Sequence, residues 1–170
     1  FFGIIRDYKG LDWLLEAFAK SNFKEHKSKL LVAGEFYTDK KPYLDIIEKH
    51  QLSDHIILHD KFINDSEVCN YFNACDVVIQ PYKHATQSGV TQIAFHFEKP
   101  MIVTDVGGLS EIVPHDEAGL VADPNIESIT NTINSFFENG KKEKYIDGVK
   151  NEKSKYSWDI FLDKTQELIN

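Results

Sequence analysis

The stretch DVVIQPYKHATQSGVTQIAFHFEKPMIVTD, residues 76–105, sets the fold. Two short apolar runs, at 76–81 and 100–105, flank a segment in which Ile93, Ala94 and Phe97 recur at helical spacing. An apolar run, a helix and a second apolar run are the signature of a β-α-β unit, whose two strands are parallel. Small and polar residues around one glycine lie where the first run gives way to the helix. The stretch therefore predicts a parallel sheet with a specialised junction at a strand end.

The same alternation continues on both sides of this stretch. Further short apolar runs predict strands at 1–5, 29–34, 55–59 and 119–122. Apolar residues at helical spacing predict helices between them, and a last helix is expected from Ser157 to about Ile169. We predict an α/β fold, a Rossmann-like doubly wound parallel sheet with helices on both faces and a C-terminal helix. In such sheets, ligands bind at the carboxyl ends of the strands.

Size and composition narrow the class of protein. The chain has 170 residues, 42% of them hydrophobic and 27% charged, which predicts one globular domain over residues 1–170. The formal net charge of -8 does not favour nucleic acid or an anionic membrane as a partner. Cys69 and Cys75 lack the spacing of a metal site, and we expect reduced thiols in the core.

The first residues bear on location and completeness. Phe1 is not a methionine and already belongs to an apolar run, so we expect a piece of a longer protein whose missing part is N-terminal. No apolar stretch reaches the roughly 20 residues that span a bilayer, and the first five residues are too short for a signal peptide. We expect a cytoplasmic protein, either free or peripheral at the inner membrane through the missing domain.

Two strand ends offer groups that bind anions. Arg6 and Lys9 follow the first predicted strand, where two cations beside a helix N-terminus would favour a phosphate. After the predicted strand at 76–81, Ser88 and Gly89 can open a helix. This would leave the backbone N–H groups of Gly89, Val90 and Thr91 free for an anion. Two solvated surface charges and a plain Ser-capped helix are the simpler interpretations.

A third strand end, TDVGGLSEIV at 104–113, carries two glycines and then Glu111. Its carboxylate can accept hydrogen bonds from sugar hydroxyls or stabilise its own loop, and the sequence does not separate the two. His55 and His59 have no third ligand in view, so structural histidines are favoured over a metal pair. The turns after the first two strands lack the glycine pattern of a dinucleotide-binding enzyme.

With these residues in view, the chain resembles the C-terminal, donor-binding domain of a retaining glycosyltransferase of the GT-B group one (family four) class. The resemblance covers almost the whole chain and depends on five stretches in the family's order: FFGIIRDYKGLDWLLEAF, LLVAGE, NACDVVIQPY, ATQSGVTQIAFHFEKPMIVTDVGGLSEIV and GLVADP. It implies a two-domain enzyme of glycan biosynthesis, in which this half holds a nucleotide-diphosphate-sugar and the absent N-terminal half carries the acceptor, a sugar or a lipid-linked glycan. No metal or other cofactor is implied.

The resemblance also implies roles for individual residues. Arg6, Lys9, Ser88, Gly89 and Val90 match the positions that hold the donor diphosphate, although the family's usual arginine position is Ile4 here. Two glutamates that many members carry at the helix junction are absent, and Gln87 and Gln92 are the nearest polar replacements.

Neutral amides can hydrogen-bond sugar and ribose hydroxyls, as Glu111 can, but they cannot stabilise positive charge that develops at the sugar. The resemblance implies that Phe62 and Ile63, after the third predicted strand, are the candidates for contact with the base. The residues point to no catalytic group. Two other interpretations stay open: half of a nucleotide-sugar epimerase or phosphorylase, and a non-catalytic α/β nucleotide-binding module.

Overall fold

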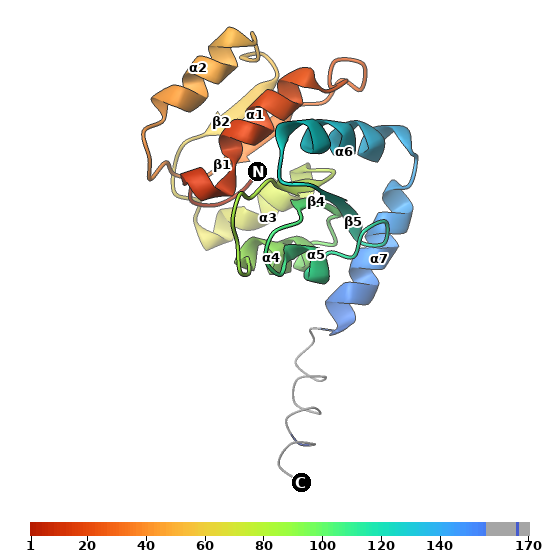
Figure 1. Ribbon diagram of the computed structural model, residues 1–170. Coiled ribbons are helices and arrows are strands. Elements are labelled where there is room, and N and C mark those ends of the chain that lie inside the picture. Colours follow the sequence, from red (N-terminus) through yellow and green to blue (C-terminus); the bar gives the residue numbers. More distant parts are fainter. Residues whose placement is uncertain (156–165, 167–170) are drawn as a thin grey trace.

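Strands with helices on both faces make up the fold (Figure 1), as predicted. The computed structural model describes residues 1–155 and residue 166. Five strands are present in this part of the chain, and all of their pairings are parallel: β1 (Leu30–Ala33), β2 (Ile56–His59), β3 (Val78–Gln80), β4 (Met101–Thr104) and β5 (Gly119–Ala122). Each lies inside an apolar run that predicted a strand.

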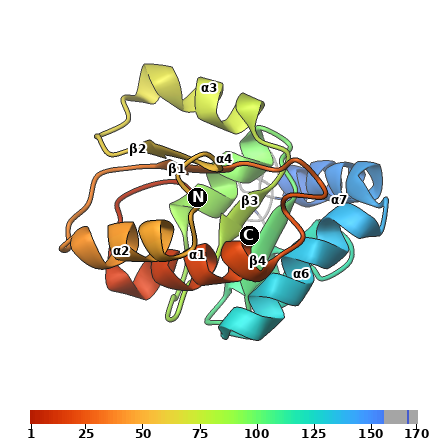
Figure 2. The ribbon, with the colours of Figure 1, turned by 90° about the horizontal axis from the view of Figure 1, so that it is seen from above.

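The helices divide between the two faces of the sheet. In Figure 2, α1 (Leu11–Lys20), α2 (Lys41–Lys49) and α6 (Ile126–Glu138) lie on one side of the strands. The opposite side carries α3 (Asp65–Ala74), α4 (Gly89–His96), α5 (Leu109–Ile112) and α7 (Lys142–Lys155). A 3-10 turn, η1 (Asp7–Lys9), precedes α1.

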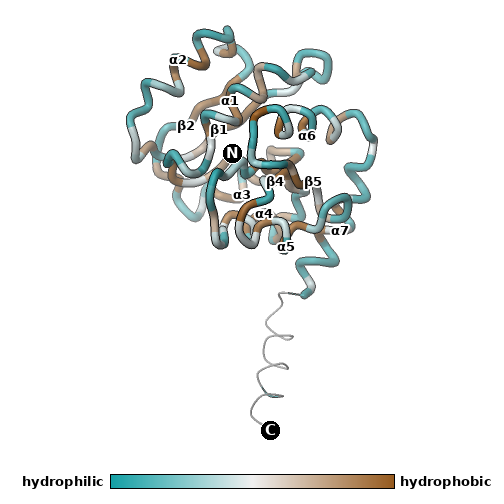
Figure 3. The backbone as a smooth tube through the Cα atoms, viewed as in Figure 1, coloured by the Kyte–Doolittle hydropathy of each residue, from teal (hydrophilic) through white to brown (hydrophobic). Residues whose placement is uncertain are grey.

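Two apolar cores result, because buried parallel strands present side chains to both faces. Along β4, Ile102 packs with α1 and α6, whereas Met101 and Val103 pack with α4 and α5. All four residues of β4 are buried, as expected for a central strand that is covered on both sides. Figure 3 shows this arrangement as apolar strands inside and hydrophilic residues on the outer faces of the helices.

The first predicted strand differs from the prediction. Residues 1–5 form two isolated parallel bridges, Phe2 to Ala33 and Ile5 to Phe36, and not a continuous strand. Gly3 lies between the bridges with φ of 99°, which interrupts the extended backbone. Hydrogen bonding therefore defines two sheets among the described residues, β1-β2 and β3-β4-β5.

The C-terminal region contains a helix that the sequence analysis did not predict. The last helix was expected only from Ser157, whereas α7 begins at Lys142, shortly after the end of α6. The helix expected at 157–169 falls on residues that, apart from residue 166, lie outside the described part of the chain. Within the described residues, no helix has the length and apolar character that crossing a membrane requires.

Candidate functional site

The chain segment that follows residues 1–5 packs against the segment that follows β3. The backbone N–H of Lys83 donates to the carbonyl oxygen of Tyr8 at 2.7 Å. The rings of Tyr8 and Tyr82 meet edge to face, with centroids 6.0 Å apart. The two predicted anion-binding segments therefore share one edge of the fold.

Lys9 lies beside the first turn of α4. Its Nζ lies 5.7 Å from the centroid of the Tyr82 ring. A Cβ atom built on Gly3 would lie 3.2 Å from Lys9 Nζ and 3.7 Å from Cγ2 of Val90, so both groups border the same small space. The structure brings Lys9 and the start of α4 together, as the strand-end positions predict.

Lys9 and Arg6 form a cationic pair without a carboxylate partner in residues 1–155. Arg6 is exposed, and its Cζ lies 5.4 Å from the centroid of the Tyr37 ring. Burial lowers the pKa of the Lys9 ammonium, and the charge of Arg6 lowers that pKa further. Two unpaired cations side by side produce a local positive potential on a chain whose net charge is negative.

The start of α4 differs from the prediction in its free donors. Ser88 is the N-cap, and its Oγ accepts a hydrogen bond from the backbone N–H of Val90 at 3.3 Å. The N–H of Thr91 donates to the carbonyl oxygen of Ser88 at 3.2 Å. Within the described residues, only Gly89 of the three expected amides makes no hydrogen bond, because Ser88 caps its own helix. No atom lies within 4 Å of the position of a Cβ on Gly89, which leaves space there.

A buried polar network that the sequence pattern does not predict supports this helix start. Gln80, at the end of β3, donates from Nε2 to Ser88 Oγ at 2.7 Å and to the Tyr82 hydroxyl at 3.2 Å. Its Oε1 accepts from the Thr91 hydroxyl at 2.9 Å. The Thr104 hydroxyl donates to the carbonyl oxygen of Tyr82 at 2.6 Å. The available signal was one glutamine inside an otherwise apolar run.

The double-glycine loop packs on the loop before α4. The backbone N–H of Gly108 donates to the carbonyl oxygen of Thr86 at 3.0 Å. Gly107 has φ of 54°, and a Cβ on it would overlap the carbonyl oxygen of Ala85. The glycines thus permit this close approach of two backbones. Glu111 lies exposed on α5, just after the loop.

Other predicted site residues make no side-chain hydrogen bond to this cluster in the described residues. Gln87, Gln92 and Glu111 are exposed and form no side-chain hydrogen bond with the described residues. Phe62 is 64% exposed, whereas Ile63 is 8% exposed and belongs to the core. No hydrogen bond, ion pair or ring contact in residues 1–155 joins Phe62 or Ile63 to Lys9 or to the start of α4.

The histidines that were considered for a metal site have other contacts. The ring of His55 packs edge to face on Phe23, with centroids 4.8 Å apart. His59 Nδ1 lies 2.9 Å from the Tyr71 hydroxyl. In the part of the chain that the structure describes, no three His, Cys, Asp or Glu side chains gather as metal ligands would.

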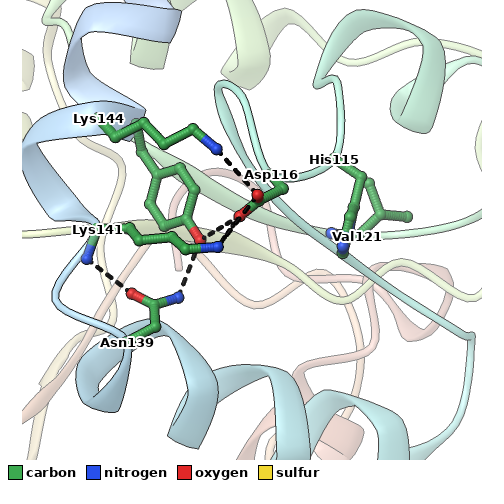
Figure 4. A network of polar contacts seen from close by, with 7 residues as sticks. His115, Asp116, Val121, Asn139, Lys141 and Lys144 are labelled. Atoms are coloured by element: carbon green, nitrogen blue, oxygen red, sulfur yellow. Dashed lines mark hydrogen bonds and ion pairs between the residues drawn. The ribbon is translucent and has the colours of Figure 1, made fainter.

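Two cavities lie away from this edge. One, of about 450 Å³, is mostly apolar and is lined by Phe1 and by the first residues of β1 and β3. The other, of about 600 Å³, is bordered by the polar network of Figure 4. There, Asp116 accepts hydrogen bonds from Lys141, Lys144 and Tyr145, and these hydrogen bonds hold the pKa of its carboxyl well below the usual range. Because these groups satisfy one another, they tie α7 to the loop before β5.

Comparisons with known proteins find a matching family model, sequence relatives and similar solved structures. The family model described as "Glycosyl transferases group 1" matches residues 1–152. An uncharacterised glycosyltransferase of Methanocaldococcus jannaschii is 28% identical over 168 residues, which cover 97% of this chain and 42% of the relative. The chain thus spans less than half of the length of that relative.

Solved structures share the fold at low sequence identity. The C-terminal domain of a group 1 glycosyl transferase family protein from Francisella tularensis has a TM-score of 0.79 and 19% identity, with 91% of this chain and 83% of that one covered. Anabaena HepE in complex with UDP and glucose has a TM-score of 0.71 and 21% identity, with 89% and 42% covered.

Proposed function

The chain belongs to the group 1 glycosyl transferases, and from that premise we propose that it is the donor-binding domain of a retaining GT-B enzyme. Such an enzyme would move a sugar from a nucleotide-diphosphate-sugar to a hydroxyl of a glycan or a lipid-linked glycan. The observation that carries the proposal is the unpaired, half-buried Lys9 ammonium beside the start of α4. An anion with two or more negative charges satisfies that position better than water does.

Lys9, Arg6 and the start of α4 would each contribute to binding of the diphosphate. Lys9 and Arg6 would bind the diphosphate, together with the N–H of Gly89 and the hydroxyl of Ser88. Val90 would contribute less than predicted, because its N–H already bonds to Ser88. The open space at Gly89 would let a phosphate approach the backbone.

The exposed amides and carboxylate would bind the sugars. Gln87, Gln92 and Glu111 are free to hydrogen-bond the hydroxyls of the donor sugar and of the ribose. Phe62 is exposed enough to stack on a base, whereas Ile63 would support it from the core. No metal is needed in this scheme, because Lys9, Arg6 and the free N–H of Gly89 would stabilise the leaving diphosphate.

The acceptor would bind mainly to a preceding domain. The chain covers less than half of its relative, and the similar Francisella structure is by its description a C-terminal domain. A second domain on the N-terminal side would close over the strand ends and bring the acceptor hydroxyl to the sugar. The enzyme would act in the cytoplasm, free or peripheral at the inner membrane.

Calorimetric titration of the full-length protein with UDP and GDP, with and without EDTA, tests the proposal. UDP is the first probe, because a structural neighbour was solved with UDP and glucose. We expect saturable binding that EDTA leaves unchanged. Absence of saturable heat with both nucleotides would instead favour a non-catalytic module, the alternative that the missing glutamates support. Residues 1–170 alone should bind more weakly and transfer no sugar, and turnover by this fragment would contradict the two-domain scheme.

A further inference from the structure

Gln80 is a buried amide directly beneath the proposed phosphate site. It ends β3, between apolar strand residues and the loop that leads to α4, and it is 1% exposed. Burying an amide costs free energy unless its groups are hydrogen-bonded. Both the amide nitrogen and the amide oxygen of Gln80 have partners, in Ser88, Tyr82 and Thr91.

The partners of Gln80 decide how Ser88 can act. A serine hydroxyl has two acceptor lone pairs and one hydrogen to donate. Gln80 Nε2 donates to Ser88 Oγ at 2.7 Å, and the N–H of Val90 donates to the same oxygen at 3.3 Å. With both lone pairs occupied, the hydroxyl hydrogen remains to be donated.

The Tyr82 hydroxyl lies 3.3 Å from Ser88 Oγ, and by geometry either group can donate in this hydrogen bond. Burial raises the pKa of Tyr82, so its hydroxyl stays protonated at neutral pH. A hydrogen from Tyr82 would be the third to reach Ser88 Oγ, more than its lone pairs accept. Tyr82 is therefore the acceptor of the Ser88 hydrogen within the described residues, and because Ser88 is partly exposed, this hydrogen can turn from Tyr82 to a ligand beside Gly89.

We propose that Gln80 is a positioning residue that fixes the Ser88 hydroxyl as a hydrogen-bond donor to a phosphate oxygen of the nucleotide donor. Ionised phosphate oxygens only accept, so a hydroxyl is useful to them only as a donor. This inference rests on the proposed function, since it assigns a role within the same site. Gln80 thus affects ligand binding through Ser88, in addition to any effect on the stability of α4.

A double-mutant cycle on the full-length protein tests this inference, with UDP as the probe and calorimetry as the measurement. Gln80→Met keeps the length of the side chain and removes its N–H donors, together with the oxygen that accepts from Thr91. We expect it to raise the Kd for UDP about tenfold when Ser88 is present, and less than about twofold in the Ser88→Ala background. Thr130→Val, which removes a buried hydroxyl on α6 far from α4, is the matched control and should leave the Kd unchanged.

Three outcomes would overturn the inference. An unchanged Kd in Gln80→Met would mean that the amide has only a structural role, or that its oxygen and not its nitrogen faces Ser88. An equal loss in both backgrounds would mean that Gln80 acts on α4 independently of Ser88. No UDP or GDP binding by the unmodified protein would remove the proposed function as well, which separates that failure from the other two.

A second variant keeps the test decisive if Gln80→Met folds poorly. A buried glutamate at this position has a raised pKa, and only its protonated form can donate to Ser88. The Kd of Gln80→Glu for UDP, relative to that of the unmodified protein, should therefore fall as the pH is lowered from about 8 to about 6. A ratio that is constant across this range would also overturn the inference.

Discussion

Lys9 reaches across the ring of Tyr82, with Nζ 5.7 Å from the ring centroid. The hydroxyl at the far end of the same ring lies 3.3 Å from Ser88 Oγ. One aromatic side chain thus contacts both the cation and the helix cap. Because an aromatic face holds the ammonium, and no carboxylate in the described residues does, its charge remains available to a ligand.

Removal of the Lys9 charge should weaken nucleotide binding without unfolding the protein. For Lys9→Met we expect a loss of about 1.5–3 kcal/mol, roughly ten- to a hundredfold in the Kd for UDP, because one charge-assisted contact is lost. The midpoint of urea unfolding should change little, since the ammonium has no carboxylate or hydrogen-bond partner to lose in residues 1–155 and the aliphatic part of the side chain is kept. Lys20→Met, at the exposed end of α1, is the control and should bind normally. Normal binding by Lys9→Met would remove Lys9 from the site.

UDP affinity should fall at alkaline pH earlier than an ordinary lysine would allow. Burial and the neighbouring Arg6 lower the pKa of Lys9, and only the protonated amine attracts phosphate. As pH rises through that lowered pKa, the positive charge is lost and the Kd increases. Titrations of the unmodified protein and Lys9→Met across this range provide the check, because the variant should lack this step. A step that persists in the variant would assign it to another group.

Gly107→Ala should disturb both the fold and the site. The new methyl group would overlap the carbonyl oxygen of Ala85 and would also strain a backbone with φ of 54°. We expect a loss of about 1–3 kcal/mol in the free energy of unfolding and weaker UDP binding, because the loop before α4 must move.

Gly140→Ala is the matched control for Gly107→Ala. Gly140 has a similar φ of 65°, but no atom lies within 4 Å of the position of its Cβ. It should therefore show the cost of backbone strain alone, about 1 kcal/mol or less, and should bind UDP normally. Equal effects of the two changes on the Kd for UDP would refute the close approach of the two loops.

The Asp116 network should stabilise the packing of α7 in a pH-dependent way. Hydrogen bonds from Lys141, Lys144 and Tyr145 lower the pKa of Asp116 in the folded state. Its contribution is therefore present above the pKa of an unfolded aspartate, about 3.9, and is lost as pH falls through the lower folded value. Urea unfolding of the unmodified protein and of Asp116→Asn should differ by a constant amount from neutral pH to about pH 5, and that difference should shrink in more acidic solution. A difference that does not depend on pH would show that the charge of Asp116 is unimportant.

The buried strands could be predicted because burial on two faces leaves continuous apolar runs. The runs at 76–81 and 100–105 contain β3 and β4, which are buried throughout. Helix α7 could not be found in this way, because lysines dominate its sequence and few of its residues are buried, notably Tyr145 and Val149. Packing against α4 and β5 decides its position, and that information is spread over the whole fold.

In the candidate site, strand-end positions predicted that Lys9 and the start of α4 would meet. The number of free amides was overestimated, because a serine cap consumes donors that a sequence pattern leaves uncounted. Gln80 was missed because a glutamine in a strand shows its importance only when its partners on the next helix are known.

The cationic pair of Arg6 and Lys9 belongs to a chain with a formal net charge of -8. The Debye length is roughly 8 Å at physiological salt. A nucleotide several Debye lengths away therefore experiences almost none of the net negative charge or of the charge of the cationic pair. Closer in, the net negative charge of the chain repels the nucleotide, and the cationic pair attracts it only at short range. Added salt screens both the repulsion during approach and the attraction in the bound state. The rate of association and the rate of release should therefore both increase with ionic strength.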